Sequence, residues 1–369
     1  MHRLHKIYTG CCSNIYNDNP EGACIMGIEA VKEITVSKIL SEIEVKPSIE
    51  AEKLAERYGY LAYMVERYIR ILGDDAENLL RAMEKPSILK PTVRCNQLRV
   101  NCRWLENRLR SLGFELRPLE WALGAYEVVR SPPTPSIGAT HEYLKGYYYL
   151  HRDPSPLIAP LNMDLGPGLE VLDTCAAPGG KATYIAQLIE DRGLVVANDI
   201  SLNRIRALVS NIARMGFRSI AVIRGDARRI DRILAKKFER ILVDAPCSAE
   251  GYIMFDPSRK RKTGEKELAA LVKREIEILA SAIELLESGG ILVYSTCSIA
   301  PEENEYVISK ILRIYNKEIE IIDPRIDIWS RGIHGIWIKD LSPDVRKCIR
   351  TWPHKHHMGG SFVCIIRKK

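Results

Sequence analysis

The chain has 369 residues, of which 46% are hydrophobic and 27% charged, and its formal net charge is +7. This length excludes a small disulfide scaffold, and no apolar run reaches the roughly 20 residues that a membrane span needs. The N-terminus has no apolar signal core, so we expect a cytoplasmic protein. The mild basic excess permits a polyanionic partner, although a solvated basic surface explains it equally well.

Two regimes precede the main body of the chain. Residues 1–26 show no clear periodicity, which predicts an irregular N-terminal arm. Residues 27–91 show helical periodicity, because LAYMVERYIRILG repeats apolar residues at three- and four-residue spacing and ends at Gly73. Ser48 precedes an acidic turn, as at the start of a helix.

A different pattern follows in residues 92–150. TVRCNQLRVN and AYEVVR read as strands, and RWLENRLRSLG reads as a short amphipathic helix. Together they predict a small α/β module that resembles an RRM. The tyrosines at 147–149 and the proline-spaced DPSPLIAPLNMDLGPG then predict a linker.

Residues 151–369 predict the largest domain. From Leu169 onward, nearly all-apolar strands alternate with helices, which is typical of an α/β fold with a doubly wound, mostly parallel sheet. Ligands of such sheets bind beyond the carboxyl ends of the strands. The acids and cysteines of interest follow predicted strands at these ends: Asp173, Cys175, Asp199, Asp226, Asp244, Cys247 and Cys297.

The turn after the first of these strands is made of small residues. They are Cys175, Ala176, Ala177, Pro178, Gly179, Gly180 and Lys181. Such a turn lets a backbone approach a ligand closely, although tight strand–helix packing requires the same residues. Asp199 is placed to accept hydrogen bonds from ribose hydroxyls, and Asp226 to reach an adenine edge. Carboxylates beside a neutral turn favour a nucleoside without a pyrophosphate, and S-adenosylmethionine with its sulfonium charge is such a ligand.

Five motifs carry a family resemblance. LDTCAAPGGKATYIAQL, VVANDIS, RGDARR, VDAPCS and YSTCS follow one another along the chain. In this order they resemble the Nop/Sun family of S-adenosylmethionine-dependent RNA cytosine-5 methyltransferases. The resemblance implies that 175–181, Asp199, Asp226 and Asp244 line the S-adenosylmethionine site. It also implies a Rossmann-like sheet whose last strand, SFVCIIR, is antiparallel. The near absence of Gln, beside abundant Ile, Arg, Lys and Glu, is typical of a thermophile.

The chemistry of cytosine gives two cysteines distinct roles. C5 of cytosine is a poor nucleophile until a thiolate adds to C6, and afterwards the C5 proton and the thiolate must both leave. By analogy with DNA enzymes, Cys247 in Pro-Cys would attack. The resemblance implies instead that Cys297 attacks, that Cys247 assists release and that Asp244 orients the cytosine. Two inert strand-end thiols are the structural alternative.

The remaining cysteines lack such settings. Cys11, Cys12 and Cys24 fall in the expected arm, where irregular chain is favoured over a metal site or a disulfide. We expect the others to be core or incidental residues: Cys95, Cys102, Cys348 and Cys364. Because no CxxC pair occurs, no metal is expected.

The predicted partner is RNA with an unpaired or flipped cytosine. The compact chain favours tRNA, and rRNA stays open. The basic run 259–262 contacts phosphate or forms a solvated face. For His354, His356 and His357 an RNA-facing loop is favoured over a metal cluster. His151-Arg152-Asp153 departs from the family pattern, which leaves the substrate contacts there open. We expect a monomer. The competing hypotheses are a catalytically silent RNA-binding relative and a methyltransferase acting on DNA or a small molecule.

Overall fold

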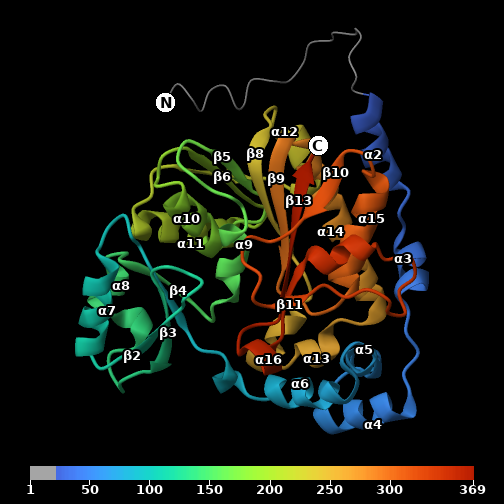
Figure 1. Ribbon diagram of the computed structural model, residues 1–369, viewed down its shortest axis with the longest axis horizontal. Coiled ribbons are helices and arrows are strands. Elements are labelled where there is room, and N and C mark those ends of the chain that lie inside the picture. Colours follow the sequence, from blue (N-terminus) through green and yellow to red (C-terminus); the bar gives the residue numbers. More distant parts are fainter. Residues whose placement is uncertain (1–21) are drawn as a thin grey trace.

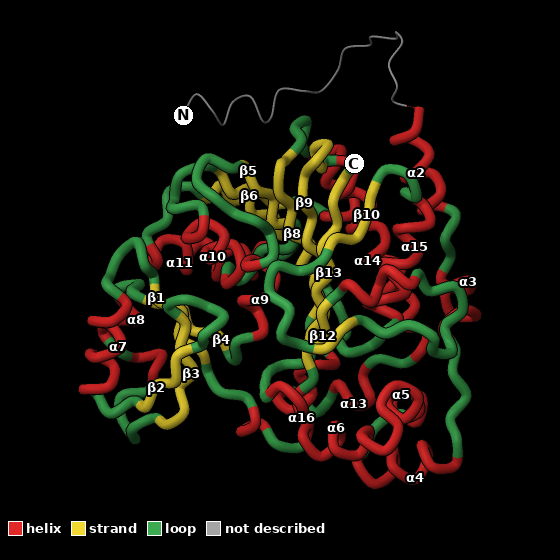
Figure 2. Tube along the Cα trace, in the orientation of Figure 1, coloured by secondary structure: helices red, strands yellow, loops and turns green. Residues whose placement is uncertain are grey.

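The computed structural model describes residues 22–369, with the backbone alone for residues 22–26. Figure 1 shows a large central sheet with helices on both sides, a small module to one side, and helices α4, α5 and α6 below the sheet. Figure 2 separates the strands of the small module from those of the central sheet. No helix in the described part of the chain is long and apolar enough to cross a lipid bilayer.

The N-terminal segment is helical, as its periodicity predicts. It contains α2 (Gly22–Lys32), α3 (Val36–Ile43), α4 (Ile49–Tyr58), α5 (Ala62–Leu72) and α6 (Ala76–Met83). Ser48 caps α4 by accepting a hydrogen bond from the amide of Ala51 at 3.2 Å. The expected irregular arm is wrong for residues 22–26, because α2 begins at Gly22 and packs on a helix distant in sequence, α14 (Glu265–Glu284). The rest of that arm, with Cys11 and Cys12, lies outside the described residues, as does the side chain of Cys24.

The small module is an antiparallel sheet covered by helices. Its strands are β1 (Thr92–Cys95), β2 (Glu115–Pro118), β3 (Ala125–Arg130) and β4 (Tyr148–His151), in the order β2-β3-β1-β4, with α7 (Cys102–Ser111) and α8 (His141–Leu144). The tyrosines at 147–149 were predicted as part of a linker, and this is wrong because Tyr148 and Tyr149 pair with β1 in β4. The proline-spaced segment also packs: it forms α9 (Ile158–Leu161), where Ile158 is fully buried.

The central sheet confirms the predicted fold class. The parallel strands are β5 (Glu170–Asp173), β6 (Leu194–Asp199), β7 (Ile220–Arg224), β8 (Phe238–Asp244) and β9 (Leu286–Thr296), in the order β7-β6-β5-β8-β9. The last strand, β13 (Ser361–Lys368), runs antiparallel to β9, as the resemblance implied. Beyond it, β10 (Ile319–Ile322) and β12 (Ile349–Thr351) pair with β13, and β11 (Ser330–Arg331) pairs with β12, all antiparallel.

Apolar strands form this sheet because both of its faces are covered. On one face Leu172 and Ile241 share a core with Ile276 of α14. On the other face Val171 and Leu242 pack with α9 and with the helix that follows β5. Figure 1 shows α10 (Gly180–Leu188) and α11 (Leu202–Met215) on one side and α14 and α15 (Val307–Ile314) on the other. Consecutive residues of one strand therefore face opposite cores.

Four cysteines expected to be core or incidental residues are paired. Cys95 is bonded to Cys102 in the small module, and Cys348, which directly precedes β12, is bonded to Cys364 within β13. Cys95, Cys348 and Cys364 are fully buried core residues, whereas Cys102 is half-buried. The sequence does not reveal the pairing, because disulfide partners are set by tertiary distance rather than by spacing.

Candidate active site

A cavity of about 280 Å³ lies at the carboxyl ends of β5, β6, β7 and β8. Three of the predicted cofactor residues line it, namely Cys175, Asp199 and Asp226. The other lining residues are Thr174, Ile200, Arg204, Gly225, Ala227, Arg228, Pro246, Arg274 and Ile278. The position is that expected for a ligand of a doubly wound sheet.

The small-residue turn packs against protein on its outer side. Gly179 has a φ of +104°, and a β-carbon there would lie 2.9 Å from the side chain of Leu208. A β-carbon on Gly180 would lie 3.2 Å from the rings of Tyr149 and His151 in β4. The two glycines therefore bring α10 against α11 and the small module, which is the packing role that the sequence left open beside ligand approach.

The two carboxylates in the cavity are held by arginines of this chain. Asp199 pairs with Arg204 at 3.2 Å and accepts a hydrogen bond from the Ala177 amide at 3.3 Å. Asp226 pairs with Arg228 at 2.6 Å, which holds the pKa of the Asp226 carboxyl below its usual value. Both acids line the cavity, and carboxylate oxygens there can accept hydrogen bonds from a hydroxyl or an amine of a bound nucleoside.

Asp244 ends β8 within a charged cluster. Its Oδ1 accepts a hydrogen bond from Ser295 at 2.7 Å and pairs with Nζ of Lys181 at 2.5 Å. Burial disfavours the charged form of Lys181, but the attraction of Asp244 outweighs it and raises the pKa of Lys181. Burial and then Asp244 raise the pKa of Asp173, at the end of β5, to about 7. In this cluster Lys181 therefore stays positively charged, and the carboxyl group of Asp173 titrates near neutral pH.

The two cysteines lie together because they follow β8 and β9, which are adjacent parallel strands. Sγ of Cys247 is 3.3 Å from Sγ of Cys297. The hydrogen bond to Cys297 and then burial raise the pKa of Cys247 well above its usual range. The raised pKa favours the protonated form of Cys247, which lies within hydrogen-bond distance of Cys297. Cys297 interacts electrostatically with the ammonium group of Lys181.

One buried carboxylate ties the two cysteine loops together. Glu303 accepts hydrogen bonds from the amide of Ser248 at 2.7 Å and from its hydroxyl at 2.6 Å. The Ser248 hydroxyl is in turn 3.1 Å from that of Ser298. Because these serines directly follow Cys247 and Cys297, the network sets the distance between the two sulfur atoms. The VDAPCS and YSTCS motifs place both serines, but Glu303 carries no sequence signal that links it to them.

A second cavity, of about 360 Å³, opens beside the cysteines. Of the two, Cys297 lines it, together with Arg152, Pro156, Ala249, Tyr252, Phe255, Asp256 and Arg259. Pro246, which directly precedes Cys247, lines the first cavity. The cysteine pair therefore lies between a cavity at the strand ends and a cavity that reaches Cys297.

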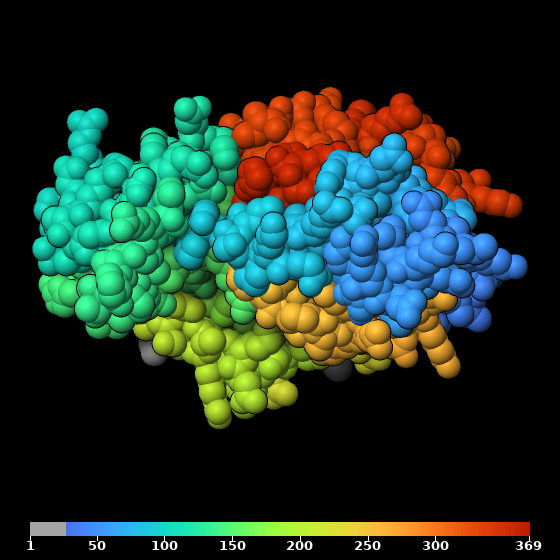
Figure 3. Space-filling model, turned by 90° about the horizontal axis from the view of Figure 1, so that it is seen from below, coloured from blue at the N-terminus to red at the C-terminus, as the bar shows by residue number. Residues whose placement is uncertain are grey.

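The N-terminal helices support this region from below. Figure 3 shows them in blue across the underside, between the C-terminal residues in red and the segment around α13 (Arg259–Lys262) in orange. Arg67 of α5 is fully buried and pairs with Glu250 and Glu302, each at 2.8 Å. Glu250 lies three residues after Cys247, so α5 contacts the loop that carries that cysteine.

The basic run 259–262 is only partly available to a ligand. Lys260 donates to the carbonyl of Tyr58 at 2.9 Å, and Arg261 donates to the carbonyl of Gly59 at 3.1 Å. Both therefore hold the helical segment in place. Arg259 is the member of the run that lines the cavity beside Cys297.

The C-terminal histidines make separate contacts. Nε2 of His354 is 3.0 Å from Asp75, and Nδ1 of His356 accepts a hydrogen bond from the Trp352 amide at 2.8 Å. Within residues 27–369, no group of three metal-ligating side chains comes together. His354 therefore joins α16 (Pro353–His356) to the N-terminal helices.

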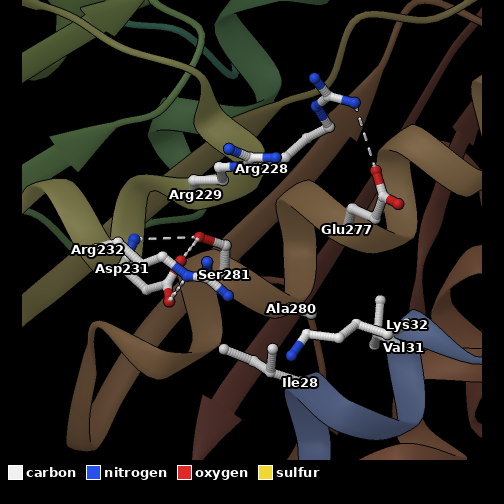
Figure 4. Close-up of a pocket in the computed structure, with 10 residues that line it drawn as sticks. All are labelled: Ile28, Val31, Lys32, Arg228, Arg229, Asp231, Arg232, Glu277, Ala280 and Ser281. Atoms are coloured by element: carbon white, nitrogen blue, oxygen red, sulfur yellow. Dashed lines mark hydrogen bonds and ion pairs between the residues drawn. The ribbon is translucent and has the colours of Figure 1, made fainter.

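A third pocket, of about 260 Å³, lies where α2, α14 and α12 (Ile230–Ile233) meet (Figure 4). It is rich in arginine, but acids of the same region pair with these cations. Arg228 contacts Glu277 at 3.8 Å, and Arg232 contacts Asp231 at 3.9 Å. Arg228 also pairs with Asp226 and lines both cavities, so this pocket adjoins the cavity at the strand ends.

The strand order, the antiparallel β13 and the acids at the strand ends define the class of Rossmann-like methyltransferases. A family model described as 16S rRNA methyltransferase RsmB/F matches residues 160–367. The chain belongs to this family, and the predicted resemblance to the Nop/Sun enzymes is confirmed.

Three relatives illustrate the match. A 28S rRNA (cytosine-C(5))-methyltransferase of Mus musculus is 33% identical over 85% of this chain, which spans 40% of the mouse protein. The crystal structure of a methyltransferase homologue from Pyrococcus horikoshii has a TM-score of 0.77 and is 32% identical, over 87% of this chain and all of that one. The structure of NSun6 from Pyrococcus horikoshii with SFG has a TM-score of 0.71 at 24% identity, over 82% of this chain and 97% of that one.

Proposed function

We propose that this protein transfers the methyl group of S-adenosylmethionine to C5 of cytosine in RNA, through a covalent bond between Cys297 and C6. The observation that carries the proposal is the cysteine pair, 3.3 Å apart, whose member Cys297 faces a cavity. A binding protein without catalysis has no use for two strand-end thiols in contact, beside a lysine and a carboxylate. This argument also disfavours the catalytically silent alternative.

Cys297 acts as the nucleophile. Its thiolate forms a bond to C6 of cytosine, and the electrons of the C5–C6 double bond make C5 nucleophilic. C5 takes the methyl group, and the C5 proton then passes to a water molecule. The electrons of the C5–H bond restore the C5–C6 double bond while the Cys297–C6 bond breaks and returns the thiolate. Lys181 favours the thiolate at the start and at the end of this cycle.

Cys247 assists the release of the product. As the protonated partner, it donates its S–H to the sulfur of Cys297. The same contact stabilises the Cys297 thiolate when the bond to C6 breaks. Asp244 has a side chain that is 31% exposed, and it accepts a hydrogen bond from the exocyclic amine of the cytosine and so orients the ring.

The residues at the strand ends fit S-adenosylmethionine, which supplies an electrophilic methyl group on a sulfonium. Asp199 and Asp226 offer acceptors for ribose and adenine. The buried Oδ2 of Asp173 has no hydrogen-bond partner within the described protein, and a carboxylate nearby suits a cationic ligand. The Pyrococcus horikoshii NSun6 structure contains SFG, an analogue of S-adenosylmethionine, which supports this ligand class.

Two RNA classes are candidates for the substrate. The mouse relative and the family description concern rRNA, and tRNA is the alternative. Cytosine-specific bisulfite sequencing of tRNA and rRNA, with and without the protein, distinguishes the two. Absence of any 5-methylcytosine that depends on the protein, in either RNA, contradicts the proposed function.

Two cysteine variants test the mechanism. Cys297→Ala is expected to lose both methyl transfer and covalent complex formation. Cys247→Ala is expected to accumulate a protein–RNA complex that survives denaturing electrophoresis, because attack proceeds and release does not. A covalent complex in Cys297→Ala and none in Cys247→Ala reverses the assignment.

A further inference from the structure

The cavity beside Cys297 has an aromatic wall that the catalytic cycle does not use. Phe255 lies in the turn that follows Cys247 and remains 38% exposed at the cavity. Its ring stacks near that of Tyr252, with centroids 6.3 Å apart and planes at 29°. The guanidinium of Arg152 lies 5.4 Å from the Phe255 centroid.

This wall is held rigidly from behind. The Tyr252 hydroxyl is 2.9 Å from that of Ser155 and donates to Asp153. Asp153 is fully buried and also accepts a hydrogen bond from the Gly359 amide at 2.9 Å. A β-carbon at Gly359 would lie 2.5 Å from the Tyr252 ring. Two other chain segments, residues 153–155 and Gly359, therefore fix Tyr252. Because the wall is already ordered, a ligand that stacks on Phe255 costs little conformational entropy in the protein.

The chemistry of the wall matches a nucleotide. Unstacked bases of RNA stack on aromatic rings and on arginine planes, and arginines pair with phosphates. Arg152 and Arg259 both lie at this cavity. The target cytosine must lie over the sulfur of Cys297, so the rest of the cavity is left to a neighbouring nucleotide.

We infer that Phe255 and Arg152 form a stacking site for the base adjacent to the target cytosine. The inference rests on the proposed function in RNA. It also gives a role to the His151-Arg152-Asp153 segment, whose substrate contacts the sequence left open. Stacking uses the face of a base and not its edge. The site therefore accepts any base, prefers purines, and loses affinity when the base is missing.

Binding measurements test the site without turnover. The probe is a single-stranded RNA of adenosines with one central cytosine, compared with RNAs in which the 5′ or the 3′ neighbour is abasic. Stacking of one base on an aromatic side chain is worth roughly tenfold in affinity. Phe255→Leu is therefore expected to bind the parent RNA about tenfold more weakly, whereas Phe255→Trp binds it like the wild type.

The abasic probes separate stacking from a general effect of the mutation. With the wild type, one abasic neighbour is expected to weaken binding about tenfold, and with Phe255→Leu the same change has less than a twofold effect. Equal affinities of wild type and Phe255→Leu for all probes overturn the inference, as does an equal abasic loss in both proteins. Unchanged melting temperatures verify folding. Failure of the proposed function is a different result, namely that the wild type transfers no methyl group to any RNA.

Discussion

The buried Arg67 is expected to contribute more to stability than any single residue of the N-terminal helices. Its guanidinium pairs with Glu250 and Glu302, and side-chain exposure is 0% for Arg67, 3% for Glu250 and 1% for Glu302. Arg67→Met leaves two buried carboxylates without their cation. Breaking a buried pair in this way costs about 3–5 kcal/mol.

The assay is urea unfolding followed by circular dichroism at two pH values. Burial already raises the pKa of Glu302 to about 6, in spite of Arg67. Without the cation the pKa of Glu302 rises further. At low pH the carboxyl group is then protonated, which removes the cost of a buried unpaired charge in the variant. The destabilisation by Arg67→Met is therefore expected to be smaller at pH 5.5 than at pH 8.

The matched control is Arg70, one turn further along α5. Arg70 is 41% exposed and pairs with Glu66 at 2.7 Å, so Arg70→Met is expected to cost less than about 1 kcal/mol. An Arg67→Met variant that is no less stable than Arg70→Met at pH 8 refutes the reasoning. A loss of methyl transfer at temperatures where Arg67→Met remains folded is expected as well, because Glu250 belongs to the loop of Cys247.

Two further predictions concern the site. The pKa of Asp173 is about 7 in the folded protein, whereas its usual value is 3.8. Protonated Asp173 therefore stabilises the folded state by about 4 kcal/mol below pH 4, and this contribution is lost as the pH rises through 7. Asp173→Asn should flatten the fall in unfolding free energy between pH 5 and pH 8, and an unchanged slope contradicts this. Gly251→Ala should reduce methyl transfer more than tenfold, because its β-carbon would lie 1.8 Å from the carbonyl oxygen of Gly360 and the Gly251 amide bonds to the carbonyl of Cys297. Gly166→Ala is the control, since nothing lies within 4 Å of a β-carbon there; equal activities of the two variants would show that this contact does not position Cys297.

The N-terminal helices contact the loop that carries Cys247. Arg67, Lys260 and Arg261 join the helical segment to the loop after Cys247. The segment is therefore part of the structure that holds the site, and two of the four residues of the basic run bind backbone carbonyls of this segment. Cations that appear solvated in a sequence can serve such contacts, because the partner carbonyls come from residues about 200 positions away.

Much of the fold follows from local pattern in the sequence. The apolar strands, the helices between them and the acids and cysteines at their ends are local features, and the structure has the alternation of strands and helices predicted from Leu169 onward. The parallel sheet follows from the same pattern, because strands apolar on both faces must be covered on both sides. The motifs around Cys175, Cys247 and Cys297 are local as well, so the family and the candidate site could be predicted.

The tertiary structure decided the contacts between residues that lie far apart in the chain. The disulfides, the Glu303 network and the burial of Arg67 join segments with no shared local signal. Tyr148 and Tyr149 belong to a strand because β1, more than fifty residues earlier, pairs with them. Likewise, only the folded chain brings Phe255 and Arg152 to the cavity of Cys297. Periodicity reports which face of an element is buried, but the partner on that face is set by packing.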